Sequence, residues 1–177
     1  MNGMKYILEE LTSVDDFKNI EDVARVIEKV TDDNERKYYL DDLQSMGYQG
    51  FDLPQYSDYC DFIFKCIPAE KTKVLMARET CCGKDVIGIA IAGLTGKVRG
   101  FRSGRLLFFW VDPNYRKTTL LTTLYKKMWA WFSKKNCANV SINLKTWQEG
   151  ILNYFMNKGY HINNVELTGP VKFLEKV

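Results

Sequence analysis

Apolar residues in the first 70 positions recur at intervals of three and four, which is the spacing of one face of an α-helix. The clearest case is residues 20–30, where the apolar positions are Val23, Val26, Ile27 and Val30. Residues 36–46 and 56–67 show the same spacing, so we expect three amphipathic helices in this part of the chain. A short apolar segment at residues 6–8 precedes them and is predicted to be a strand.

The pattern changes to short apolar runs after residue 71. Residues 73–78, 85–94 and 106–111 are predicted strands, and the middle one is almost continuously apolar, which is typical of a strand buried on both faces. Between the last two strands, glycines alternate with basic residues over residues 96–105, and we expect a basic loop there.

Helices and strands alternate in the rest of the chain. We predict helices over residues 118–135 and 148–158, and strands over residues 140–144, 161–167 and 171–174. Antiparallel strands therefore come first and a strand–helix–strand crossover follows them. This order predicts a sheet with a parallel pair near its middle, and a ligand crevice where neighbouring strands diverge.

The composition is that of one globular domain, residues 1–177, because 46% of the residues are hydrophobic and 27% are charged. No apolar run approaches the roughly 18 residues of a membrane span, and the N-terminus lacks an apolar signal region, so we expect a cytoplasmic protein that does not enter a membrane. The cysteines lack metal-finger spacing and are expected to be reduced, although vicinal Cys81 and Cys82 could form a redox disulfide.

The net charge of +3 is unevenly distributed. Residues 1–70 contain 16 acidic and 7 basic side chains, a net charge of −9, whereas residues 71–177 contain 6 acidic and 18 basic side chains, a net charge of +12. Such a division indicates either a basic face for a polyanion with an acidic face elsewhere, or two parts that neutralise each other across the fold. Both interpretations stay open on the sequence.

Two short motifs lie on the predicted elements. Residues 111–121 read Val-Asp-Pro-Asn-Tyr-Arg-Lys-Thr-Thr-Leu-Leu, and residues 154–160 read Tyr-Phe-Met-Asn-Lys-Gly-Tyr. They resemble two signatures of the GNAT acetyltransferase superfamily, V-x-P-x-(Y/F)-(R/Q)-x-x-G-x-(G/A) and L-Y-x-K-x-G-F, in the family's order and spacing. The resemblance is close over residues 72–177 and rests on the order of elements before that.

The resemblance implies an α/β (α+β) fold of the GNAT type, in which about four helices flank a mixed sheet of about seven strands. It also implies a divergent N-acetyltransferase that moves an acetyl group from acetyl-coenzyme A (acetyl-CoA) to an amine, without a metal. In the family, the splayed edge of the strand before the helix binds the pantetheine arm and holds the acyl carbonyl with a backbone N–H. The helix N-terminus binds the pyrophosphate, because its unpaired N–H groups and its dipole favour an anion.

The cofactor-binding residues that follow from this resemblance lie on the strand, the loop and the two motif helices. They are Phe109, Trp110, Val111, Arg116, Lys117, Thr118, Thr119, Leu120, Leu121 and Phe155. Arg116 and Lys117 would add charge-assisted hydrogen bonds to the phosphates.

The sequence departs from the first signature at Thr119 and Leu121, where the family has small residues. Glycine there allows the backbone to approach the phosphates closely. A threonine hydroxyl could donate a hydrogen bond instead, but a leucine side chain cannot, so we expect CoA binding to be weakened, rearranged or lost.

The second departure is Phe155, which stands where many family members have the tyrosine that protonates the leaving thiolate. Tyr154 is the candidate catalytic residue in its place, although a helix turns it about 100° away, and Tyr160 is the next candidate. The predicted strand 106–111 contains no carboxylate that could act as a general base. Glu79, Asp85 and Asp112 are the nearest acids, and His161 is the only histidine.

Three functions remain as alternatives. The first is an N-acetyltransferase, for which the acidic residues 1–70 would suit a cationic amine or a protein lysine as acceptor. The second is a catalytically degenerate GNAT fold with a structural or interaction role, for example in a bacteriophage virion or as a phage accessory protein. The third is nucleic-acid binding by the basic loop, with Phe101 as a stacking residue.

Overall fold

The computed structural model describes residues 6–35, 56–67, 70–80, 85–98, 101–142 and 149–160. Its elements are β1 (Tyr6–Leu11), α1 (Phe17–Glu35), α3 (Tyr56–Cys66), β2 (Thr72–Glu79), β3 (Val86–Val98), β4 (Phe101–Val111), the 3-10 helix η2 (Pro113–Tyr115), α4 (Leu120–Lys134), β5 (Cys137–Ile142) and α5 (Glu149–Met156). The chain divides into two compact units, Met1–Asn143 and Leu144–Val177, so α5 belongs to the second unit and every other element to the first.

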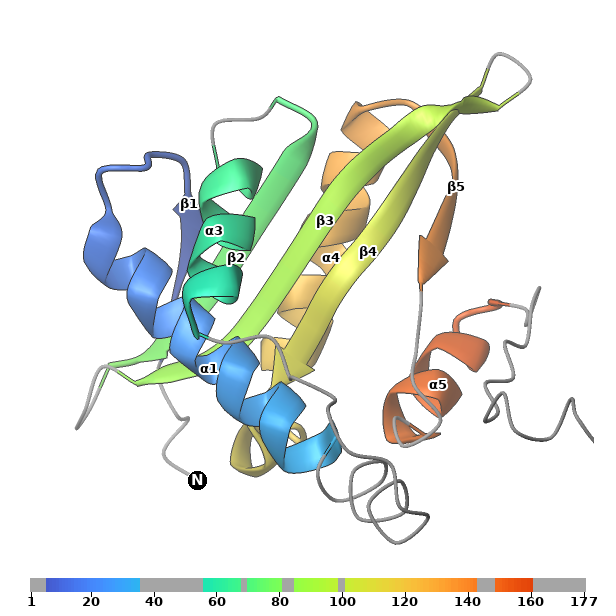
Figure 1. Ribbon diagram of the computed structural model, residues 1–177. Coiled ribbons are helices and arrows are strands. Elements are labelled where there is room, and N and C mark those ends of the chain that lie inside the picture. The colour runs from blue at the N-terminus through green and yellow to red at the C-terminus, as the bar shows by residue number, and fades with distance from the viewer. Residues whose placement is uncertain are drawn as a thin grey trace, which may run out of the picture. The chain divides into compact units, whose positions relative to one another are not determined.

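The sheet of the first unit has the order β1-β2-β3-β4-β5 (Figure 1). The first four strands are antiparallel neighbours, and β5 returns through α4 to lie parallel to β4. The predicted α+β fold with a parallel pair after a meander is therefore confirmed. Five strands are described where about seven were expected, and the predicted helix 36–46 and strands 161–167 and 171–174 lie outside the described residues.

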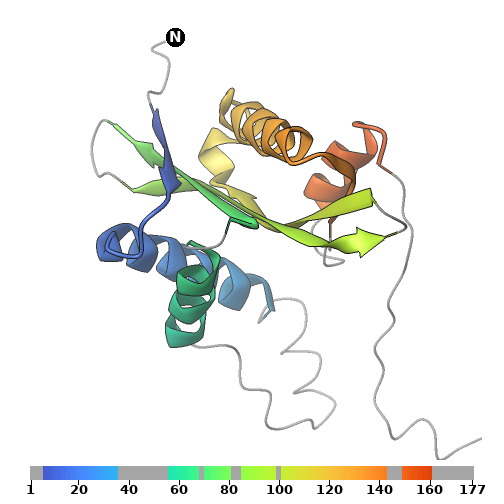
Figure 2. The same ribbon diagram turned by 90° about the horizontal axis from the view of Figure 1, so that it is seen from above.

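Helices cover both faces of this sheet, with α1 and α3 on one face and α4 on the other (Figure 2). Ile89 and Ile91 of β3 lie in the core beneath α1 and α3, together with Ile20 and Val23 of α1. On the opposite face, a Cβ atom added to Gly88 would lie 3.0 Å from Leu124 of α4. Both faces of β3 are buried, which explains the continuous apolar run that predicted this strand.

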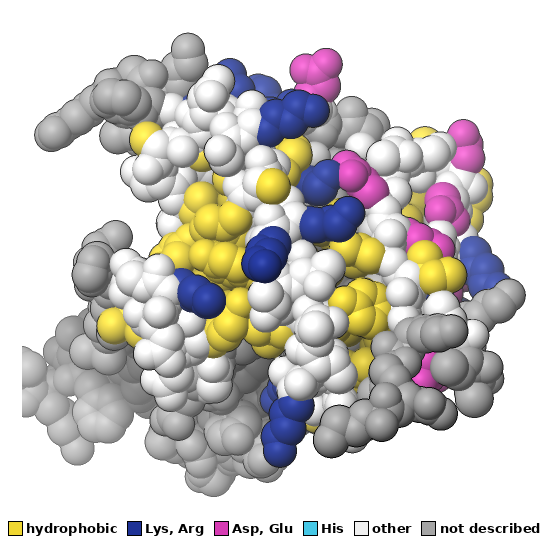
Figure 3. All heavy atoms as spheres, turned by 180° about the vertical axis from the view of Figure 1, so that it is seen from behind, with side chains coloured by type: hydrophobic (Ala, Val, Ile, Leu, Met, Phe, Trp, Pro, Cys, Tyr) yellow, Lys and Arg dark blue, Asp and Glu magenta, His cyan; other side chains and the backbone are white. Residues whose placement is uncertain are grey.

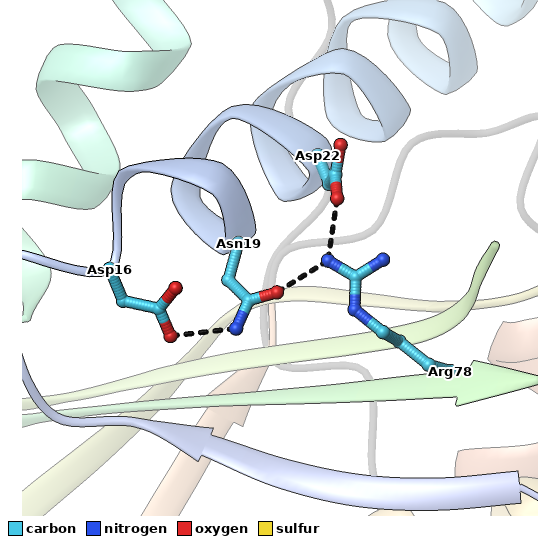
Figure 4. A network of polar contacts seen from close by, with 4 residues as sticks. All are labelled: Asp16, Asn19, Asp22 and Arg78. Carbon is cyan, nitrogen blue, oxygen red and sulfur yellow. Dashed lines mark hydrogen bonds and ion pairs between the residues drawn. The ribbon is translucent and has the colours of Figure 1, made fainter. Parts of the chain in front are cut away.

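A network of polar contacts ties α1 to β2 (Figure 4). The Arg78 guanidinium donates to Asp22 Oδ2 at 2.6 Å and to Asn19 Oδ1 at 2.5 Å, and Asn19 in turn donates to Asp16 Oδ2 at 2.6 Å. Only 13% of the Arg78 side chain is exposed, so these contacts compensate the charge of a largely buried group. A second ion pair joins Lys73 of β2 to Glu10 of β1.

The predicted basic loop at residues 96–105 is wrong. β3 continues to Val98 and β4 begins at Phe101, and the two strands pair as far as Val98 opposite Phe101. Gly104, one of the glycines that suggested a loop, has a packing role. A Cβ atom at this position would lie 2.5 Å from Cδ1 of the buried Phe132 on α4. Gly104 therefore allows α4 to lie close to the sheet.

Candidate functional site

The parallel pair β4–β5 is incomplete. β5 pairs with β4 from Arg102 to Leu106, whereas β3 pairs with β4 along its whole length to Val111. Within the part of the chain that the structure describes, no strand pairs with the other edge of β4 at residues 107–111. The described part of β5 ends at Ile142, opposite Leu106, whereas β4 continues to Val111 (Figure 1). The predicted divergence of neighbouring strands stays a prediction, because the residues that follow Ile142 lie outside the described ranges.

A β-bulge lies in β4 directly after its last residue that pairs with β5. Ile91 pairs with Phe108 and Ala92 with Leu106, so Leu107 has no opposite residue on β3. Bulges bend and twist the strand that carries them. The bulge at Leu107 therefore bends β4 directly after the residues that pair with β5.

The peptide groups at the end of β4 alternate between the two edges of the strand. The N–H of Asp112 donates to the carbonyl of Ile87 on β3 at 2.9 Å, so the peptide groups of Phe109 and Val111 face away from β3. The Arg116 guanidinium confirms this direction, because its Nε donates to the Val111 carbonyl at 3.1 Å. The edge of β4 at residues 107–111 that is turned away from β3, called the separated edge below, thus carries the backbone groups of Phe109 and Val111, whose side chains are buried.

The loop between β4 and α4 is held by the residues of the first motif. The Asp112 carboxylate accepts from the N–H of Asn114 at 2.8 Å, and Pro113 begins η2. The hydroxyl of the buried Tyr115 donates to the Glu79 carboxylate at the end of β2. Glu79 and Asp112, two of the acids near the predicted strand, therefore hold this loop in place through these hydrogen bonds.

Unpaired N–H groups lie at the start of α4, as at any helix N-terminus. Thr118 Oγ1 accepts from the N–H of Leu120 at 3.2 Å, and the N–H of Thr123 donates to the Thr119 carbonyl at 2.9 Å. Among the described residues, no hydrogen-bond partner exists for the N–H groups of Lys117, Thr119, Leu121 and Thr122. With the positive end of the helix dipole, these donors form an arrangement suited to an anion.

The side chains around these donors have different roles. Arg116 and Lys117 are exposed, and Leu121 is half-buried, whereas Leu120 is fully buried against Gly88. Leu120 therefore contributes its side chain to the core and only its backbone to the loop.

Sequence reasoning missed Tyr6 of β1. Its hydroxyl lies 3.2 Å from Thr119 Oγ1 and 3.1 Å from Thr123 Oγ1. The Thr119 hydroxyl, which we considered as a phosphate donor, is thus engaged by the first strand. No local pattern signals this contact, because 113 positions separate Tyr6 from Thr119.

Basic side chains surround apolar ones on the face that carries α4, and most acidic side chains lie toward the edge of the sheet formed by β1 (Figure 3). Along α4, Lys126 and Lys127 are exposed beside the stacked rings of Tyr125 and Trp129, whose centroids are 4.1 Å apart. Burial raises the pKa of the Tyr125 hydroxyl. The exposed surface of α4 at Lys126 and Lys127 is therefore positively charged.

The second motif lies in the other unit, on α5 and the turn after it. The Phe155 ring is buried and contacts the rings of Tyr154 and Tyr160, each with centroids 5.4 Å away. Gly159 has a φ of 87° and ends the helix, and the N–H of Tyr160 donates back to the Phe155 carbonyl at 3.2 Å. His161 lies outside the described residues. The structure thus brings the strand and loop candidates together in one unit, while Tyr154 and Phe155 belong to the other.

Two observations concern other classes of site. Within the described ranges, no group of three or more His, Cys, Asp or Glu residues could hold a metal ion. None of the helices among those residues is long and apolar enough to cross a membrane.

Several of the solved structures similar to this chain are acetyltransferases, at low sequence identity. An aminoglycoside acetyltransferase from an uncultured soil metagenomic sample is 13% identical with a TM-score of 0.65, over 95% of this chain and 99% of that one. An aminoglycoside N-acetyltransferase in complex with CoA is 12% identical with a TM-score of 0.63, over 96% of each chain. A ribosomal-protein-alanine N-acetyltransferase from Brucella melitensis biovar Abortus 2308 is 11% identical with a TM-score of 0.60, over 94% of this chain and 99% of that one.

The similarity is one of structure, because no protein-family model matches the chain and no curated protein matches its sequence. The matched structures cover 94% to 96% of this chain.

Proposed function

Because the chain has the fold of the GNAT acetyltransferases, we propose that it transfers an acetyl group from acetyl-CoA to a primary amine. The observation that carries this proposal is the position of two features within one unit. The separated edge of β4 ends at Val111, and the unpaired N–H groups at the start of α4 follow six to eleven residues later. An extended amide chain that ends in a pyrophosphate matches both features.

The pantetheine arm would lie along the separated edge of β4, where the peptide groups of Val111 and its neighbours face away from β3. Such a strand edge binds an extended chain of amides through backbone hydrogen bonds, as an added strand would be bound. The N–H groups of Lys117, Thr119, Leu121 and Thr122 would receive the pyrophosphate, with the exposed side chains of Arg116 and Lys117 beside them.

Acetyl-CoA supplies the acetyl group as a thioester, which an amine can attack directly. The attacking nitrogen forms a bond to the carbonyl carbon, the carbon–sulfur bond breaks, the nitrogen loses a proton and the sulfur gains one. A backbone N–H of β4 would polarise the carbonyl. Phe155 cannot supply the proton to sulfur, which leaves Tyr154, Tyr160 or water for that role. Cys60, Cys66 and Cys137 are not in disulfide bonds, which suits the cytoplasm, where acetyl-CoA is available.

Calorimetric titration with acetyl-CoA and with CoA tests the proposal. We expect a dissociation constant in the micromolar range for both, weakened by added salt because the phosphates contribute charge. Release of CoA thiol in the presence of an amine would then measure transfer. Absence of binding at millimolar acetyl-CoA would contradict the proposal and favour the structural or interaction role.

A further inference from the structure

The side of α4 that is turned away from the sheet, called the outer face of α4 below, carries lysines and small side chains. The buried residues of the helix recur at every fourth position from Leu120 to Phe132 and face the core. The exposed residues are Thr122, Lys126, Lys127, Ala130, Ser133 and Lys134. All residues of α4 are described and none is acidic, so the charge of the outer face is positive along the helix.

Arg102 of β4 extends this charge past the end of the helix. It is exposed and pairs with Cys137, the first residue of β5. Its Nη1 donates to the carbonyl of Lys135, the C-cap of α4, at 3.4 Å. Lys134 is the exposed residue directly before this cap, so two segments that are distant in the sequence place cationic side chains at the same end of α4.

The positive charge is not balanced locally in the sequence. Residues 113–148 contain seven Lys or Arg residues and no Asp or Glu. Exposed helices commonly place Glu three or four positions from Lys, because such pairs stabilise the helix. α4 lacks that stabilisation, and a surface of one charge sign attracts a partner of the opposite sign.

Acidic side chains of β1 and β2 have other partners. Glu10 forms an ion pair with Lys73, and Glu79 accepts a hydrogen bond from the Tyr115 hydroxyl. Most acidic side chains lie toward the edge formed by β1, whereas basic ones gather on the face that carries α4 (Figure 3). The sequence left two interpretations of the unequal charge, and the outer face of α4 favours the basic face for a polyanion.

The residue types on the outer face distinguish between classes of anionic partner. Protein interfaces are depleted in Lys, Ser and Ala and enriched in aromatic residues. A helix that lies in a membrane surface inserts Trp, Phe or Leu, whereas Tyr125, Trp129 and Trp131 of α4 are half-buried. Lys, Arg, Ser and Thr side chains are those that bind the phosphates of nucleic acids.

The spacing of the cations also fits a chain of phosphates. Lys126 and Lys134 are separated by about 12 Å along the helix, at roughly 1.5 Å per residue. A nucleic-acid duplex carries one negative charge per about 1.7 Å of its axis, so one backbone offers phosphates to both lysines and to Arg102. A small anion could reach only one end of this surface.

We propose that the outer face of α4, together with Arg102, binds the phosphate backbone of a nucleic acid. This interaction is separate from the proposed acetyl transfer, because it uses Lys126, Lys127 and Lys134 instead of the N–H groups at the start of the helix. It also differs from binding by a basic loop, since the helix supplies most of the cations.

Fluorescence anisotropy of a labelled duplex of about 20 base pairs, which is longer than α4, tests the inference. Duplex DNA, duplex RNA and single strands of the same sequence are compared, and the form bound most tightly identifies the source of the phosphates. We expect micromolar dissociation constants at low salt. Four cationic contacts predict a loss of affinity of about a hundredfold between roughly 50 and 200 mM salt.

The double variant Lys126→Glu, Lys127→Glu reverses the charge at the middle of the outer face. Its control is Lys18→Glu, Lys29→Glu, which makes the same change in net charge on exposed positions of α1, on the opposite face of the sheet (Figure 2). We expect the α4 variant to bind at least about tenfold more weakly and the control to change by less than about threefold. Urea unfolding verifies that both variants are folded.

Two competitors separate this surface from other anion sites. Saturating CoA should leave nucleic-acid binding in place, and complete displacement by CoA would overturn the inference by assigning the binding to the start of α4. Tighter binding of polyglutamate, or binding to phosphatidylserine vesicles without binding to nucleic acid, would also overturn it. Equal losses in the two double variants, or none in either, would do the same. A protein that binds nucleic acid in this way but not acetyl-CoA would contradict the proposed function alone.

Discussion

Gly104 of β4 lies directly beneath Phe132 of α4, and replacing it with alanine introduces the smallest change that can disturb this contact. The added Cβ would lie 2.5 Å from Cδ1 of the ring. Carbon atoms in contact prefer a separation of about 3.5–4.0 Å, so the ring must move by roughly 1 Å or more. Phe132 is 2% exposed and contacts the rings of Trp129 and Trp131, which leaves little room for that movement.

Insertion of a methyl group into a well-packed core costs about 1–3 kcal/mol, and we expect Gly104→Ala to fall in the upper half of this range. The gain in strand propensity over glycine, at most about 1 kcal/mol, offsets only part of the cost. Urea unfolding measures the free energy of unfolding. Tryptophan fluorescence is the probe, because Trp129 and Trp131 adjoin the perturbed ring.

Two further variants make the comparison specific. Gly150→Ala has no atom within 4 Å of the added Cβ, and because Gly150 lies in the first turn of α5 we expect its stability to be unchanged or slightly higher. Phe132→Leu in the Gly104→Ala background removes the ring atoms that clash, so the double variant should lose less stability than the sum of the single changes. A Gly104→Ala protein as stable as the unmodified chain would refute the close approach of α4 to β4.

Three other predictions concern the site and the core. Arg116→Ala should weaken CoA binding about tenfold to a hundredfold, the value of a charge-assisted hydrogen bond, and an unchanged dissociation constant by calorimetry would reject its role. Phe155→Tyr should raise the rate of acetyl transfer, measured as CoA release, by restoring a hydroxyl; a slower variant would point to Tyr154, Tyr160 or water as the proton donor. Arg78→Leu should destabilise the protein by about 3 kcal/mol in urea, because Asp22 loses its partner, whereas Lys65→Leu on α3 should change stability by less than roughly 0.5 kcal/mol.

Much of the fold follows from local patterns of the sequence. The intervals of Val23, Val26 and Ile27 predict α1, and the apolar run of β3 predicts a strand covered on both faces; both are confirmed. The motif at residues 111–121 likewise marks the junction of β4 and α4. These features could be predicted from the sequence because each depends on residues that are neighbours along the chain.

The features that could not be predicted depend on contacts between residues that are far apart in the sequence. Gly104 looks like a turn residue until Phe132, 28 positions later, is known to occupy the space above it. The contact of Tyr6 with Thr119 and the register that ends at Leu106 opposite Ile142 are likewise non-local. The order of elements predicted that neighbouring strands diverge, but the bulge at Leu107, directly after the last residue that pairs with β5, has no local signal.

The hydrogen bonds of Tyr6 connect the first strand of the chain to the first turn of α4, and this connection has a thermodynamic consequence. Among the described strands, β1 lies at the edge of the sheet and pairs with β2 alone. Any ligand that binds better when Thr119 is held by Tyr6 must, by reciprocity, favour the docked state of β1 by the same factor.

A hydrogen bond between two exposed hydroxyls contributes about 0.5–1.5 kcal/mol. The contact of Tyr6 with Thr119 can therefore change the affinity for CoA by at most about two- to tenfold. Tyr6→Phe should reduce CoA affinity within that bound, and CoA should slow amide hydrogen exchange in β1 of the unmodified chain more than in the variant. The docking of β1 and the binding of CoA beside Thr119, 113 positions away, would then depend on the same equilibrium.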